Sequence, residues 1–138
     1  MDSKMKLVSA SAGFPSPAEN YLEEQLDLNK YLIKNKESSF FVRVSGDSMI
    51  NVGIFDNDIL IVDRSLVPVR QSIILASLDG ELVVKKLIRD EFKNYYLKSE
   101  NTNYPNIKLD SNTDTIIWGV VTYVIHKLTW INDSSIRL

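Results

Sequence analysis

Residues 72–88 read SIILASLDGELVVKKLI, and this stretch decides the class of fold. Two runs of apolar and β-branched residues flank Asp79-Gly80, a dipeptide that favours the tight turn of a short hairpin. The pattern therefore predicts two strands, at 72–77 and 81–88, that pair antiparallel. The centre of the chain is expected to be β-sheet.

Further short strands are predicted on both sides of this hairpin. Turn-rich segments separate them at intervals of roughly ten residues, a spacing typical of sandwiches and barrels. The predicted strands are Phe40–Val44, Ile59–Val62, Tyr95–Lys98, Ile107–Leu109 and Ile116–Leu128, the last with a bend at Gly119. The whole pattern predicts a mainly β domain, built as a sandwich or a partly closed barrel.

The two ends of the chain depart from this β pattern. Residues 1–16 are rich in Ser and Ala and end in a proline-containing stretch, which favours an extended tail. Residues 17–36 are predicted to be helical in two pieces, with Asp27 as the cap of the second piece, 28–34. Residues 129–138 are mostly polar and are predicted to be loosely attached.

The composition limits the possible functions. The 138 residues suffice for one domain with a real core, because 44% are apolar and 25% are charged. A net charge of −2 offers no bulk attraction to DNA or to an anionic membrane. The absence of cysteine excludes disulfides, cysteine-ligated metals and thiol catalysis. The longest apolar run, 115–125, is about half of a membrane-spanning helix, and no secretory signal is visible, so a cytoplasmic protein is expected.

A candidate nucleophile lies in the stretch Ser45-Gly46-Asp47-Ser48-Met49. A predicted strand ends just before it, the glycine permits a sharp turn, and a short helical turn can begin at Ser48. Such a turn lifts a hydroxyl out of the sheet and directs backbone N–H groups at the group it attacks, as acyl transfer requires. Gly-Asp-Ser is also common turn chemistry, so a capped turn is the alternative interpretation.

Lys85 and Lys86 lie in a predicted strand with apolar residues on both faces. Because side chains alternate between the faces, at least one ammonium group is expected against apolar surface. Burial lowers the pKa of a lysine, and a neutral amine can accept the proton of a serine hydroxyl. A Ser-Lys dyad is thus the economical choice in a chain whose only histidine is His126. Both amines can instead reach water along their stems, and alternation does not choose between them.

Four segments of the chain resemble the UmuD proteins, which belong to the LexA-like self-cleaving serine peptidases. Their order and spacing are similar over about residues 13–127. The segments are Gly13-Phe14-Pro15-Ser16-Pro17-Ala18, Val44-Ser45-Gly46-Asp47-Ser48-Met49, Asp56-Asn57-Asp58-Ile59-Leu60-Ile61-Val62-Asp63 and Asp79-Gly80-Glu81-Leu82-Val83-Val84-Lys85-Lys86-Leu87. The resemblance implies a LexA and signal-peptidase type of fold, a curled sheet or partly closed barrel with a flexible N-terminal arm and short N-terminal helices.

The resemblance also implies a role for each matching residue. Ser48 matches the nucleophile and Lys85 the general base, while the N–H groups of Ser48 and Met49 match the oxyanion hole. Ala12-Gly13 matches the scissile bond. Small residues on both sides of this bond suit it, because the backbone must approach the serine closely. No metal ion or cofactor is expected.

Cleavage at this bond would define three parts of the chain. Residues 1–12 would be a cleavable tail, residues 13–128 the self-cleaving peptidase domain and residues 129–138 a C-terminal extension. Two departures from the family pattern accompany this division. Ala12 stands where UmuD proteins often carry Cys, and Gln71-Ser72 stands where Gly-Asp is expected.

A cellular role follows from the resemblance as well. A RecA filament on single-stranded DNA stimulates self-cleavage during the SOS response of bacteria to DNA damage. The shortened homodimer then joins a UmuC-type Y-family polymerase that copies past lesions. Such a subunit needs no sequence-specific DNA binding of its own and no membrane, in agreement with the net charge of −2. A bacterial cytoplasmic location is expected.

Three other functions compete with this interpretation. A LexA-type repressor needs a helix-turn-helix domain before the cleavage site, for which residues 1–12 are too few. A signal peptidase, which also uses a Ser-Lys pair, is expected to carry a membrane anchor. The alternative from a different class is a non-enzymatic dimeric module that regulates a DNA polymerase. In that case Ser48 and Lys85 are structural remnants and the chain stays uncut.

Several other polar and aromatic residues are assigned structural roles. His126 falls on an apolar face of its predicted strand and is expected to be a hydrogen-bonded structural histidine. Tyr95, Tyr96 and Tyr104 have no basic groove beside them and are expected to pack against the sheet. Three aspartates flank a turn and a strand without the pattern of a calcium loop, and are expected to cap turns: Asp56, Asp58 and Asp63.

Overall fold

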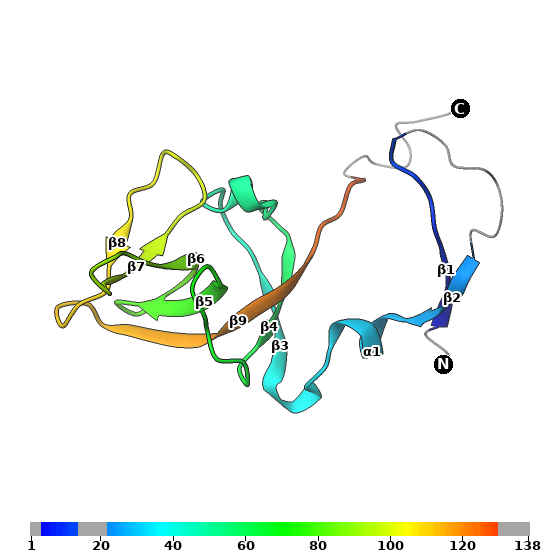
Figure 1. Cartoon of the computed structure of the whole chain (residues 1–138), viewed down its shortest axis with the longest axis horizontal. Coiled ribbons are helices and arrows are strands. Elements are labelled where there is room, and N and C mark those ends of the chain that lie inside the picture. Colours follow the sequence, from blue (N-terminus) through cyan, green and yellow to red (C-terminus); the bar gives the residue numbers. More distant parts are fainter. Residues whose placement is uncertain (1–3, 14–21, 130–138) are drawn as a thin grey trace. The chain divides into compact units, whose positions relative to one another are not determined.

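The computed structural model describes residues 4–13 and 22–129 and divides into two compact units, before and after Lys34. Within the described residues, the first unit contains a two-stranded antiparallel sheet and one short helix (Figure 1). Strand β1 (Lys4–Val8) pairs with β2 (Leu22–Asp27), and helix α1 (Leu28–Leu32) follows directly. Asp27 caps this helix as predicted, by accepting a hydrogen bond from the amide of Lys30.

The structure corrects the prediction for the first unit in two places. The segment expected to be helical contains strand β2, and the segment expected to be a tail contains its partner, β1. The register places Met5 opposite Leu26 and Lys6 opposite Gln25. Isolated helices this short are marginal, and cross-strand pairing offers the backbone an alternative set of hydrogen bonds. The rest of the predicted first helical piece, 17–21, lies outside the described residues.

The second unit is one antiparallel sheet. Within residues 35–129, the strands are β3 (Ser39–Arg43), β4 (Ile59–Asp63), β5 (Ile73–Leu78), β6 (Glu81–Arg89), β7 (Tyr95–Lys98), β8 (Ile107–Lys108) and β9 (Thr115–Ile125). Their order across the sheet is β3-β4-β9-β5-β6-β7-β8. The long strand β9 therefore lies between β4 and β5, as Figure 1 shows. Short 3-10 turns lie at Lys36–Ser38 and Ile50–Val52.

The predicted mainly β, LexA-like class of fold is confirmed. Strands β3 and β8 form the two edges of the sheet, so it stays open and does not close into a barrel. The central hairpin is confirmed too, since Asp79 and Gly80 both have positive φ, as the tight turn between β5 and β6 requires. Strand β9 ends at Ile125, earlier than the predicted Leu128.

The core occupies both faces of the sheet. Leu75 of β5 packs into one cluster, whereas its neighbours Ile74 and Ala76 pack into the other, as strand alternation requires. The first cluster consists of Val44, Met49, Ile54, Leu60, Val62 and Leu75. Met49 is only 2% exposed, and burying a side chain of this size contributes about 1.5–3 kcal/mol. The segment that carries Ser48 is therefore held by the core itself.

Gly119 marks the bend of β9 that the sequence predicted. Leu75 lies opposite Gly119 but Ala76 lies opposite Ile117, so Trp118 is an extra residue at a bulge. A Cβ atom at position 119 would lie 2.7 Å from a methyl group of Val62, so glycine is required for the close approach of β4. No helix in the described part of the chain is long and apolar enough to span a membrane.

Candidate active site

Ser48 lies in a turn that is held on both sides by buried residues. The turn follows β3, with Val44 before it and Met49 after it, both in the core. Gly46 adopts a φ of +96°, which makes the sharp change of direction possible, and its amide donates to a carboxylate oxygen of Asp56 at 2.8 Å. This fixed turn presents a half-buried Ser48 beyond the end of the strand.

The backbone around Ser48 suits an oxyanion hole. In the described part of the chain, the amides that close this turn belong to Ile50, which donates to Asp47, and to Val52 and Ile54, which donate to Met49. The amides of Ser48 and Met49 come before them, where the first N–H groups of a helical turn have no acceptor within the turn. Two adjacent N–H groups of this kind can stabilise a negatively charged oxygen.

Lys85 is buried in β6, with 8% of its surface exposed. Its Nζ donates a hydrogen bond to Ser99 Oγ at 2.7 Å and lies 5.5 Å from the centre of the Tyr104 ring. Burial lowers the pKa of Lys85 below its ordinary value of 10.5, because the surroundings disfavour the charged form. A larger share of this amine is therefore neutral near physiological pH than for a lysine in water.

Ser48 and Lys85 line the same cavity, which has a volume of about 250 Å³. Apolar side chains form most of the remaining wall. The other lining residues are Val42, Arg43, Val44, Ser45, Met49, Leu75, Leu82, Val83 and Val84. A hydroxyl group and a buried amine thus line one mainly apolar space, which is the environment that a Ser-Lys dyad needs.

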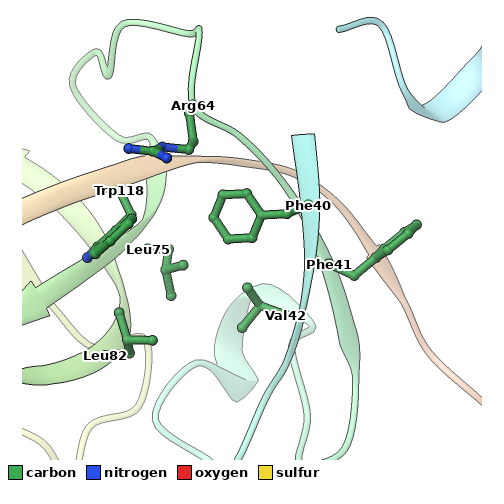
Figure 2. A pocket seen from close by; sticks show the side chains of 7 residues that line it. All are labelled: Phe40, Phe41, Val42, Arg64, Leu75, Leu82 and Trp118. Carbon is green, nitrogen blue, oxygen red and sulfur yellow. The ribbon is translucent and has the colours of Figure 1, made fainter. Parts of the chain in front are cut away.

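A second apolar groove, of about 400 Å³, continues from this cavity. The two share Val42, Leu75 and Leu82. Figure 2 shows Trp118 on one side of the groove and Phe40 on the other. The guanidinium group of Arg64 lies over the Trp118 ring, 5.1 Å from its centre. The two pockets therefore share part of an apolar wall.

The neighbouring Lys86 has a different environment. Its Nζ lies 3.4 Å from a carboxylate oxygen of Glu100, which is also 3.6 Å from Nζ of Lys98. Strand alternation left the choice between the two lysines open. The structure places Lys85 in the cavity with Ser48 and pairs Lys86 with a carboxylate, so the geometry favours Lys85 as the base.

The loop of residues 99–104 bonds to Lys85 and to Asp47, the residue before Ser48, and sequence reasoning missed it. Asn101 donates a side-chain hydrogen bond to the carbonyl oxygen of Asp47 at 2.9 Å, and the Tyr104 hydroxyl donates to the Asp47 carboxylate at 2.7 Å. This second bond raises the pKa of Tyr104. Tyr104 was expected to pack against the sheet; its ring lies beside Lys85 of β6, and its hydroxyl group also bonds to Asp47. Its polar neighbours indicated a loop, but they carried no signal of the segment that the loop contacts.

The residues assigned to turns and structural bonds occupy those roles. His126 forms a hydrogen bond with buried Asp58, whose other carboxylate oxygen accepts from the amide of Phe55 at 2.8 Å. Asp63 caps the turn after β4, where bonds from Ser65 and Asn35 lower its pKa to about 2. These predictions are confirmed, and the His126–Asp58 pair ties the segment after β9 to the loop that precedes β4.

Ala12 and Gly13, which the sequence assigned to the scissile bond, lie in the first unit. Both are exposed, and the amide of Gly13 donates to the hydroxyl of Ser11 at 3.2 Å. Among the described residues, and apart from its chain neighbours, no atom lies within 4 Å of the place that a Cβ at Gly13 would occupy. Both residues of the predicted scissile bond are thus exposed within the first unit.

Comparison with known proteins adds an independent observation. The sequence model of the family described as Peptidase S24-like matches residues 6–122. Protein SamA of Salmonella typhimurium strain LT2 is 43% identical over 117 residues, which cover 84% of this chain and 79% of SamA. Protein ImpA of Escherichia coli is 40% identical over 116 residues, covering 84% of this chain and 78% of ImpA.

A repressor is also among the similar proteins. The LexA repressor of Carboxydothermus hydrogenoformans is 34% identical over 122 residues, which cover 88% of this chain but only 58% of the repressor. The resemblance to UmuD and other LexA-like proteins that the four motifs indicated is therefore confirmed. The family match also includes Ala12-Gly13, Ser48 and Lys85.

Proposed function

The chain belongs to the Peptidase S24-like family, and we propose that it is a self-cleaving serine peptidase of the UmuD type. The observation that carries this proposal is the shared cavity of Ser48 and the buried Lys85. A serine beside an amine that burial makes more neutral can perform acyl transfer without a histidine. His126 is bonded to Asp58 and needs no part in the reaction.

The proposed reaction begins with attack of Ser48 Oγ on the carbonyl carbon of Ala12. Nζ of Lys85 takes the hydroxyl proton, and the N–H groups of Ser48 and Met49 hold the oxyanion. When the bond between Ala12 and Gly13 breaks, the Gly13 nitrogen takes that proton from Lys85 and becomes a new amino terminus. A water molecule, deprotonated by Lys85, then attacks the ester carbonyl carbon. The bond to Ser48 Oγ breaks, Oγ takes the proton back from Lys85, and the Ala12 carboxylic acid loses its proton to water.

The products are a peptide of residues 1–12 and a shortened chain that begins at Gly13. Small residues on both sides of the bond allow the backbone to reach Ser48 closely. The apolar groove that continues from the cavity offers surface to an extended substrate backbone. This surface supports a polypeptide substrate rather than a small polar one.

We extend the proposal to the cellular role of UmuD proteins. A RecA filament on single-stranded DNA stimulates the cleavage, and the shortened homodimer joins a UmuC-type Y-family DNA polymerase in the bacterial cytoplasm during SOS mutagenesis. Membership of the family supports this assignment. A net charge of −2, which provides no general electrostatic attraction to DNA, supports it as well.

Intact-mass spectrometry of the purified chain tests the proposed peptidase. Incubation at about pH 10, near the pKa of a free lysine, should produce one new species that lacks residues 1–12. Ser48→Ala should remain uncut under the same conditions, and Ser45→Ala, in the same turn, should be cut. A wild-type chain that stays uncut, both at this pH and with a RecA filament and nucleotide added, would instead indicate a non-enzymatic module that regulates a polymerase.

A further inference from the structure

Ser99 follows strand β7 directly and lies beside Lys85 of β6. Lys86 is opposite Lys98 at the end of the antiparallel pairing of β6 with β7, and Ser99 is the residue after Lys98. Ser99 is 5% exposed, and its hydroxyl oxygen accepts a hydrogen bond from Lys85 Nζ at 2.7 Å.

The Lys85 amine has few other polar contacts among the described residues. The cavity wall near it is mainly apolar, and the Tyr104 ring lies 5.5 Å from Nζ. The charged groups of the neighbouring elements are engaged elsewhere. The Asp47 carboxylate accepts from the Tyr104 hydroxyl, and the Glu100 carboxylate pairs with Lys86 and Lys98. Ser99 is therefore the group that can fix the position of the amine.

We propose that Ser99 is a positioning residue, whose hydroxyl oxygen holds the Lys85 amine in the orientation that lets it take the proton of Ser48. This inference rests on the proposed self-cleavage. A neutral amine has two N–H bonds and one lone pair. Donation of one N–H to Ser99 fixes the nitrogen of a long, flexible side chain and leaves the lone pair for Ser48.

The same hydrogen bond has a second, measurable consequence. A hydroxyl oxygen that accepts from an amine stabilises the charged ammonium form more than the neutral form, because the charged donor is stronger. The bond is therefore expected to oppose part of the lowering that burial causes in the pKa of Lys85. Removing the hydroxyl group should lower this pKa further. A merely structural role for Ser99 predicts no such shift.

The pH dependence of cleavage without a RecA filament tests the proposal. Intact-mass spectrometry should follow the wild-type, Ser99→Ala and Ser99→Thr chains between about pH 7 and about pH 11. We expect Ser99→Ala to reduce the highest rate about 10- to 100-fold, as misplacement of a reacting group does. Its rate should also level off at a lower pH than in the wild type. Ser99→Thr keeps the hydroxyl group and should restore both the rate and the midpoint.

A second measurement does not depend on cleavage. The pKa of Lys85 can be followed by NMR of the side-chain resonances in Ser48→Ala, which keeps the chain intact, with and without Ser99→Ala. A lower pKa in the double variant supports the proposal, and an unchanged pKa overturns it. An unchanged cleavage profile in Ser99→Ala overturns it too. Failure of the proposed function looks different, since the wild-type chain itself then stays uncut at every pH.

Discussion

Lys85 and Lys86 are adjacent in β6, but the two faces of this strand give them opposite surroundings. Lys85 is buried beside an apolar cavity, where its amine bonds to the hydroxyl of Ser99. Lys86 is paired with the carboxylate of Glu100. In the described part of the chain, no carboxylate is bonded to the Lys85 amine, whereas Glu100 is paired with the Lys86 amine. The same type of side chain thus lies in an apolar environment at position 85 and in an ion pair at position 86.

This comparison indicates that the environment, not the residue type, favours Lys85 over Lys86 as the proposed base. Apolar surroundings disfavour the charged form of an amine, whereas a nearby carboxylate favours it. A general base must be neutral before it can accept a proton. Because the neighbouring lysine is chemically identical, it provides a matched control at a distance of one residue.

The largest expected effect is the difference between Lys85→Ala and Lys86→Ala. A general base contributes about 100- to 10,000-fold to a rate, so loss of Lys85 should leave no product detectable by intact-mass spectrometry at about pH 10. Lys86→Ala removes an ion pair outside the cavity and should change the rate by no more than about threefold. Equal loss of cleavage in both variants would contradict the assignment of Lys85, rather than Lys86, as the base.

A smaller effect is expected at the loop that braces the Ser48 turn. Asn101 is 6% exposed and donates to the carbonyl oxygen of Asp47. Asn101→Ala removes two hydrogen bonds, to the Asp47 carbonyl and from the Asn103 amide, which should lower the free energy of unfolding by about 1–3 kcal/mol and slow cleavage. Asn103→Ala, at an exposed position of the same loop, is the control and should change neither quantity. Urea denaturation and intact-mass spectrometry measure the two effects.

The smallest effect is expected for Glu100→Gln, which changes only the face of β6 that carries Lys86. The substitution removes the negative charge shared by Lys86 and Lys98. It should lower the free energy of unfolding by about 1 kcal/mol, because the two ion pairs are only partly buried. The rate of cleavage should stay near that of the wild type. A large loss of cleavage in this variant would show that the two faces of β6 do not act separately.

The sequence predicted the second unit well because its signals are local. Asp79-Gly80 between two apolar runs defines a hairpin wherever it occurs, and a glycine before Ser48 indicates a sharp turn by itself. The first unit was predicted less well. Residues 22–27 form a strand only because β1 pairs with them, and a partner far away in the sequence leaves no local pattern.

The candidate site was only partly predictable for the same reason. Ser48 could be identified from its turn, but the alternation of side chains along the strand did not show whether Lys85 or Lys86 lies in the cavity. What separates them is the position of Glu100 and Ser99 after the neighbouring strand β7. The bonds from Asn101 and Tyr104 to Asp47 likewise join segments more than fifty residues apart, at separations of 54 and 57 residues. Such contacts are a property of the folded sheet.

The most direct test of the central claim is the rate of cleavage of the wild-type chain as a function of pH, measured without a RecA filament. A base that must be neutral predicts a rate that rises about tenfold per pH unit while the amine is mostly charged. The rise should level off at the pKa of Lys85, which burial places below 10.5. A rate that is the same from neutral to alkaline pH would contradict Lys85 as the base and with it the Ser48–Lys85 mechanism.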